Sequence, residues 1–181
     1  MPNQPCQRAG LGDPNASLCI YIGNRPDYQD LTQIQHVQPL LRGEIDAVGK
    51  MCGNGWRKVF NVYAKLVFAL PDGLASKTED AANWQAYRDD ALLQRASDTA
   101  LIFSAPKFEG DARLHIVMGR TYAKSLQLPA SLVWLDKEFA IDRDERLIVC
   151  PYFDYRQLSN SKIIRLVELM ESVYQENSQK I

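Results

Sequence analysis

Four short runs of apolar residues alternate with segments in which apolar residues recur every three or four positions. The runs lie at residues 17–22, 99–104, 114–118 and 146–150. A continuous apolar run of this length is typical of a strand that is buried on both faces of a sheet. The pattern therefore predicts one α/β domain over residues 17–176, with a mostly parallel central sheet of about four or five strands flanked by helices.

Helical periodicity is clearest over residues 54–70, where large apolar side chains occupy one side and polar side chains the other. A weaker periodicity predicts a helix within residues 39–52. Residues 76–96 begin with a Ser-x-x-Glu capping box and predict a third long helix. The last helix begins at Ser159 or Asn160, since either residue is a good N-cap.

The two ends of the chain lack these patterns. Residues 1–16 contain three prolines and two glycines, which predicts a flexible N-terminal arm. Residues 177–181 predict a polar tail. Near the C-terminus, residues 138–141 and 146–150 are strand-like and flank a polar turn, so we expect a C-terminal hairpin there.

The composition limits the class of protein. The chain has 181 residues, of which 46% are hydrophobic and 24% charged, with a formal net charge of −1. These values suit one globular domain, and the charge argues against a nucleic-acid binder that relies on bulk electrostatics. No apolar run approaches the roughly 18 residues that span a bilayer, and the N-terminus lacks a signal-peptide pattern. We therefore expect a cytoplasmic protein without a membrane partner.

The cysteines and histidines give no sign of a metal site. The four cysteines lack C-x-x-C spacing, and the chain has only two histidines. Zinc sites are usually built from closely spaced pairs of these residues. We therefore predict neither a metal nor a cofactor.

The rest of the chain is organised around residues 114–126, a predicted strand that runs directly into a helix. Gly119 lies at the turn between them. Glycine lets the backbone fold tightly and lets a ligand approach closely. The free N–H groups of the first helical turn would then form a weak anion site.

The residues that follow the predicted strands are candidate ligand-binding groups, because ligands of open α/β sheets bind beyond the carboxyl ends of the strands. They include cations and aromatic side chains that suit a ligand with a phosphate and a base. The candidates are Arg25, Lys107, Arg120, Tyr152 and Arg156. The same loops also hold acidic residues, so ion pairing at the surface remains the alternative.

Two loop residues are candidates for positioning a catalytic water, Asn24 and Asp154, because both would lie at strand ends. Their alternative role is to hold their own turns. Cys150 and His115 suggest a thiol- or histidine-dependent enzyme, if the two side chains lie within hydrogen-bond reach. The alternatives are a core cysteine and a sheet-face histidine.

Several of these segments resemble the uracil-DNA glycosylase-like superfamily. The loop Gly23-Asn24-Arg25-Pro26 is similar to the glycine–asparagine–proline loop of that family, and a long helical insert follows it. Residues 117–123 resemble its strand–glycine–helix unit. Cys150-Pro151-Tyr152 falls where its His-Pro-Ser motif lies, and Arg156 and Asn160 follow at a spacing similar to that of some members.

The resemblance implies a cleft for a nucleotide or nucleic acid at the carboxyl ends of the strands. In this cleft Asn24 would match the residue that positions the attacking water. Cys150 replaces the histidine that stabilises the departing base, and Tyr152 replaces the serine. These replacements imply degenerate or absent glycosylase activity. A non-catalytic protein-interaction domain is the alternative, and the sequence does not determine the oligomeric state.

Overall fold

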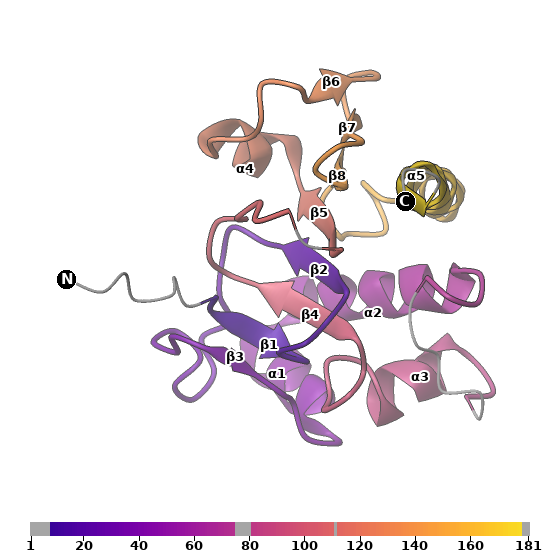
Figure 1. The fold of residues 1–181 in the computed structure, drawn as a ribbon. Coiled ribbons are helices and arrows are strands. Elements are labelled where there is room, and N and C mark those ends of the chain that lie inside the picture. Colours follow the sequence, from indigo (N-terminus) through magenta and orange to yellow (C-terminus); the bar gives the residue numbers. More distant parts are fainter. Residues whose placement is uncertain (1–7, 75–80, 111, 179–181) are drawn as a thin grey trace.

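One eight-stranded sheet lies at the centre of the computed structural model, which describes residues 8–74, 81–110 and 112–178 (Figure 1). The strand order is β3-β1-β4-β2-β5-β8-β7-β6. The strands are β1 (Gly10–Gly12), β2 (Leu18–Tyr21), β3 (Val37–Gln38), β4 (Thr99–Ile102), β5 (Leu114–Met118), β6 (Val133–Trp134), β7 (Ala140–Asp142) and β8 (Leu147–Cys150). The helices are α1 (Glu44–Cys52), α2 (Asn54–Ala69), α3 (Trp84–Asp90), α4 (Arg120–Ser125) and α5 (Asn160–Ser178).

The sheet is mixed, so the prediction of a mostly parallel sheet of four or five strands is wrong. The four strands expected from the apolar runs form its middle, where β4, β2, β5 and β8 are mutually parallel. Outside them, β1 is antiparallel to β4, β7 to β8, and β6 to β7, while β3 runs parallel to β1. Strands β1, β3 and β6 have only two or three residues, too few for a periodic pattern to reveal them. The antiparallel β7–β8 pair is the expected hairpin.

The prediction of a flexible N-terminal arm over residues 1–16 is wrong for the segment around β1. Leu11 is fully buried, and β1 pairs with β3 and β4. The glycines that suggested a loose arm instead allow close approach: a Cβ on Gly10 would lie 2.3 Å from the carbonyl oxygen of Leu101. Residues 1–7 lie outside the described residues. At the other end, α5 reaches Ser178, so the predicted polar tail begins within a helix, and residues 179–181 lie outside the described residues.

The longer helices follow the periodicity of the sequence. The apolar stripe of α2 is buried from Trp56 to Val67, which confirms the amphipathic helix predicted there. Helix α1 begins later than residue 39, because Gly43 adopts a left-handed φ of 89°. Helix α3 is capped by Asn83, whose side chain accepts a hydrogen bond from the N–H of Ala86. The capping box expected at residues 76–79 lies outside the described residues.

The helices divide unequally between the two faces of the sheet. Helices α1, α2, α3 and α5 share one core with the sheet residues Ile20, Leu101, Ile116 and Ile148, and Figure 1 shows them on one side of it. The opposite core is smaller. It contains sheet residues such as Tyr21 and is covered by α4 and neighbouring loops. The strand ends close to α4 are therefore not shielded by a long helix.

Candidate functional site

The candidate site lies at β2, where the chain switches from adding strands on one side of the sheet to adding them on the other side. Strand β4 follows β2 in the parallel core and pairs with one side of it, whereas β5, the next strand, pairs with the other side. Ligands of open α/β sheets bind in the crevice outside the carboxyl ends of the strands at such a reversal. The register pairs Tyr21 with Val117. The loop that contains Gly23 and Asn24 therefore begins beside Gly119.

Side chains from α4 and from the loop after β8 complete this strand-end site, which we define as Gly23, Asn24, Gly119, Tyr122 and Tyr152. The hydroxyl group of Tyr152 donates a hydrogen bond of 3.4 Å to Oδ1 of Asn24. Gly119 has a φ of 95°, and a Cβ added to it would lie 3.8 Å from the ring of Tyr152. A Cβ on Gly23 would lie only 2.9 Å from the ring of Tyr122. Two aromatic rings thus border two glycines and an exposed amide.

Both tyrosines stay protonated at neutral pH. Burial raises the pKa of Tyr122 above its ordinary value of 10.0. Burial also raises the pKa of Tyr152, although the hydrogen bond to Asn24 acts in the opposite direction. The two hydroxyl groups can therefore donate hydrogen bonds but are poor general bases.

Arg25 is engaged within its own loop. Its guanidinium group donates hydrogen bonds to the carbonyl oxygens of Thr32 and Ile34, both at 3.1 Å, and more weakly to that of Leu31 at 3.5 Å. It also lies 5.4 Å from the ring centroid of Phe103. The structure thus gives this predicted ligand-binding residue a structural role.

Asp154 is held by two partners of its own. Its carboxylate accepts a hydrogen bond of 2.9 Å from the N–H of Arg156 and forms an ion pair of 3.1 Å with Lys58 of α2. The hydrogen bond from Arg156 is the larger cause that lowers the pKa of Asp154, and Lys58 adds to it. This is the turn-holding role that the sequence left open for Asp154. The guanidinium group of Arg156 is exposed beside the ring of Tyr155.

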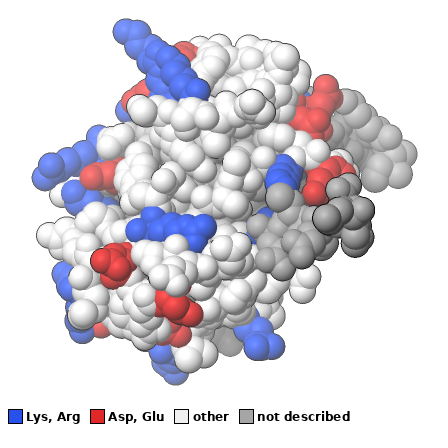
Figure 2. Space-filling model, turned by 90° about the vertical axis from the view of Figure 1, so that its left-hand side faces the viewer, with Lys and Arg blue, Asp and Glu red and all other residues white. Residues whose placement is uncertain are grey.

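The remaining predicted cations contribute no concentrated positive surface. Arg120 is exposed, donates to the carbonyl oxygen of Lys137 at 3.4 Å, and lies 5.9 Å from the ring centroid of Trp134. Lys107 is half-buried in the loop after β4. Figure 2 shows separate Lys and Arg side chains interspersed with Asp and Glu, among mostly uncharged residues, on one side of the molecule. Of the predicted residues, Asn24, Gly119 and Tyr152 come together from three different strand ends, whereas Asp154 and Arg156 contact each other within one loop.

Sequence reasoning missed two members of the strand-end site. Tyr122 lies within the predicted strand–glycine–helix unit, three residues after Gly119, so its position on the first turn of the helix was a usable signal. The contact of Gly23 with the ring of Tyr122 had no signal in the sequence, because it joins a loop and a helix that are about 100 residues apart.

Cys150 and His115 cannot form a catalytic pair. In the β5–β8 register His115 pairs with Leu147, and Cys150 pairs with Met118. Since residues 115 and 118 point to opposite faces of β5, the two side chains lie on opposite faces of the sheet. Cys150 belongs to the helix-covered core, and burial raises the pKa of its thiol. Nδ1 of His115 instead lies 2.7 Å from the hydroxyl oxygen of Tyr21.

Within residues 8–74, 81–110 and 112–178, no helix is long and apolar enough to cross a membrane. The same residues contain no group of three or more His, Cys, Asp or Glu side chains that could hold a metal ion.

Comparison with known proteins adds one finding to this geometry. Residues 9–171 match a family of unknown function (DUF6942), and the match spans almost the whole described domain. No curated protein and no solved structure matches the chain. The comparisons therefore leave function to be inferred from the site itself.

Proposed function

Since the chain belongs to DUF6942, a family of unknown function, we propose its function from the strand-end site: it binds a nucleotide at the carboxyl ends of β2, β5 and β8. The observation that carries the proposal is the hydrogen bond between Tyr152 and Asn24 beside Gly119, at the reversal of the strand order. The hydrogen bond uses Oδ1 of Asn24 and leaves its NH₂ group to donate to a ligand.

The chemistry of these groups suits a nucleobase. A side-chain amide can recognise the edge of a base through hydrogen bonds, and aromatic rings such as those of Tyr122 and Tyr152 can stack on its face. Both tyrosines are partly exposed. Gly119 has no Cβ to keep a ligand away from the backbone.

The charge distribution favours a single nucleotide over a long nucleic acid. The net charge is −1, and positive and negative side chains are interspersed on the side of the molecule seen in Figure 2. Binding to a long phosphate backbone usually requires a continuous basic surface. We therefore expect a mononucleotide to bind at least as well as single-stranded DNA of the same base.

We do not expect the bound nucleotide to lose its base. Cys150 occupies the position that a histidine has in the glycosylase-like resemblance, and its side chain is fully buried. A thiol in the core cannot reach a ligand at the surface, and Asp154 is already paired with Lys58. Incubation of the protein with uracil-containing DNA should release no uracil.

The test is a titration with uridine and adenosine monophosphates, followed by amide NMR shifts and by thermal stability. Asn24→Ala should weaken binding about tenfold, because a hydrogen bond to a ligand is lost, and Tyr152→Phe should weaken it about threefold. Tyr155→Phe is the matched control, since Tyr155 is exposed on the same loop and should bind like the wild type. The absence of any nucleotide-dependent shift, or an unchanged affinity in Asn24→Ala, would refute the proposal.

A second candidate function, protein interaction, is favoured by β6. Among the described strands, β6 pairs only with β7, so its other edge is open. Three consecutive apolar residues at this strand are exposed: Val133, Trp134 and Leu135. An open edge of this kind can accept a strand from another chain. If it does so, the protein should form a dimer or larger assembly in light scattering that Trp134→Lys abolishes. A monomer at all concentrations would exclude self-association through β6.

A further inference from the structure

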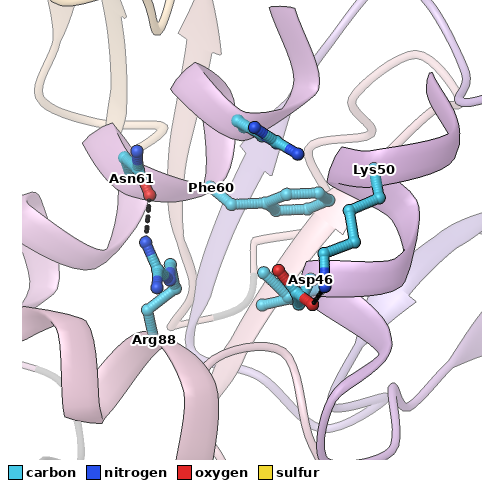
Figure 3. Close-up of a pocket in the computed structure, with 7 residues that line it drawn as sticks. Asp46, Lys50, Phe60, Asn61 and Arg88 are labelled. Atoms are coloured by element: carbon cyan, nitrogen blue, oxygen red, sulfur yellow. Dashed lines mark hydrogen bonds and ion pairs between the residues drawn. The ribbon is translucent and has the colours of Figure 1, made fainter. Parts of the chain in front are cut away.

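A cavity of about 360 Å³ lies among α1, α2 and α3 (Figure 3), and none of its lining residues belongs to the strand-end site. Its apolar lining comes from Ile45 of α1 and Phe60 of α2. Its polar lining comes from all three helices and consists of Asp46, Lys50, Arg57, Asn61 and Arg88. The cavity therefore combines an apolar wall with three cations and one carboxylate.

The three cations of the cavity, Lys50, Arg57 and Arg88, all lower the pKa of Asp46. Lys50 forms an ion pair of 2.6 Å with Asp46, and this interaction is the largest cause that lowers the pKa of Asp46. The charges of Arg57 and Arg88 lower the same pKa further. Asp46 offsets the charge of Lys50, and Asp89, which lies outside the cavity lining, offsets that of Arg88. Among the described residues, Arg57 is therefore the one of these three cations whose charge no ion pair offsets.

The two arginines are held in different ways. Arg88 donates a hydrogen bond of 2.6 Å to Oδ1 of Asn61, which orients its guanidinium group as Figure 3 shows, and it also pairs with Asp89 at 2.8 Å. The guanidinium group of Arg57 forms no hydrogen bond or ion pair with any residue that the structure describes. Its donors remain available for a ligand.

Gly49 makes room for Arg57. A Cβ on Gly49 would lie 2.7 Å from Cγ of Arg57, so the stem of the arginine crosses α1 at the position where α1 has no side chain. Gly49 is buried in the middle of a helix, where glycine costs roughly 1 kcal/mol relative to alanine. The close passage of Arg57 gives a physical reason for a glycine at this position.

From these contacts we propose that the cavity binds a small phosphomonoester, with the phosphate between Arg57, Arg88 and Lys50 and the organic part toward Ile45 and Phe60. Planar guanidinium groups bind phosphate oxygens in pairs, and lysine adds a point charge. The volume is in the range of sites for small organic ligands and too small for a macromolecule. This site is independent of the nucleotide proposal, since it shares no residue with the strand-end site.

The test uses phenyl phosphate, which has no nucleobase, and inorganic phosphate, which has no organic part. Amide NMR shifts at low ionic strength should locate both at α1, α2 and α3, with tighter binding of phenyl phosphate. Arg57→Gln and Arg88→Gln should each weaken phenyl phosphate binding about tenfold. Asp46→Asn should strengthen it, because it removes the competing carboxylate.

Two control variants make the result specific. Arg42→Gln removes an exposed arginine that pairs with Asp90 outside the cavity, and it should change the affinity less than twofold. Asn24→Ala should leave phenyl phosphate binding unchanged while it weakens nucleotide binding. Equal affinities of Arg57→Gln and the wild type, or the absence of shifts in the three helices at millimolar phosphate, would overturn the proposal. Arg57 is exposed, so its variant should fold even if Arg88→Gln does not.

Discussion

The strand-end loops and the cavity among α1, α2 and α3 use their charged residues differently. In the loops, Arg25 donates to three backbone carbonyl groups and Asp154 holds both a backbone N–H and Lys58. In the cavity, the guanidinium group of Arg57 has no such partner among the described residues, and Arg57 is exposed whereas Arg25 is half-buried. The residue type alone does not distinguish a structural cation from an available one.

The difference follows from the backbone around each residue. A helix satisfies most of its own carbonyl and N–H groups, so charged side chains on its surface are not needed by the backbone. A loop leaves these groups without regular partners, and nearby side chains with several donors satisfy them. The two proposals follow this division: we propose that the strand-end site recognises its ligand with amide and aromatic groups, and that the helical cavity recognises its ligand with charge.

The largest expected effect is the difference in stability between the variants Arg25→Ala and Arg57→Ala. Arg25→Ala should lower the free energy of unfolding by about 3 kcal/mol, because charged hydrogen bonds to the carbonyl groups of the loop are lost. Arg57→Ala should change it by less than about 0.5 kcal/mol. Urea denaturation measures both. If the two variants lose similar stability, the division between structural and available cations is wrong.

Asp154→Asn should have a smaller effect, about 1 kcal/mol at neutral pH, since the half-buried ion pair with Lys58 is lost while an oxygen acceptor remains. The pKa of Asp154 is lower in the folded state than its ordinary value of 3.8. Its ionised form therefore stabilises the protein above about pH 4, and this contribution is lost as the pH falls through the lowered pKa.

The pH dependence separates this effect from a general loss of packing. The difference in stability between the wild type and Asp154→Asn should shrink as the pH falls below about 4. Asp30→Asn is the control, because Asp30 is an exposed loop residue whose carboxylate has no partner among the described residues. A difference that stays constant down to pH 2 would mean that the charge of Asp154 does not matter.

A smaller change in stability than that of Asp154→Asn, under about 1 kcal/mol, is expected for Gly49→Ala. The gain in helix propensity opposes the displacement of Arg57, whose Cγ would meet the new methyl group. Binding of phenyl phosphate should nevertheless fall, because Arg57 is moved. Gly55→Ala adds a methyl group that meets nothing within 4 Å, and it should leave phosphate binding unchanged. If Gly49→Ala binds normally, the passage over Gly49 does not position Arg57.

The sequence alone determined the position of those helices and strands whose own residues have a strong preference for one secondary structure. The stripe of α2 and the unit of β5, Gly119 and α4 lie where their patterns predict them, because long periodic segments and a strand–glycine–helix sequence have strong local preferences. The central strands were predicted for the same reason. Neither the periodicity nor the turn residues depend on what packs against them.

Only the tertiary structure decided which strands pair and which side chains contact one another. Strands as short as β1 and β6 are stable only when paired, so their residues did not identify them. The contacts at both sites also join residues through space. They are the hydrogen bonds of Arg25 to the carbonyl groups of its loop, the hydrogen bond between Asn24 and Tyr152, and the approach of three cations from α1, α2 and α3 to one cavity. A hydrogen bond or an electrostatic field depends on distance in the folded chain, and no local pattern in the sequence encodes that distance.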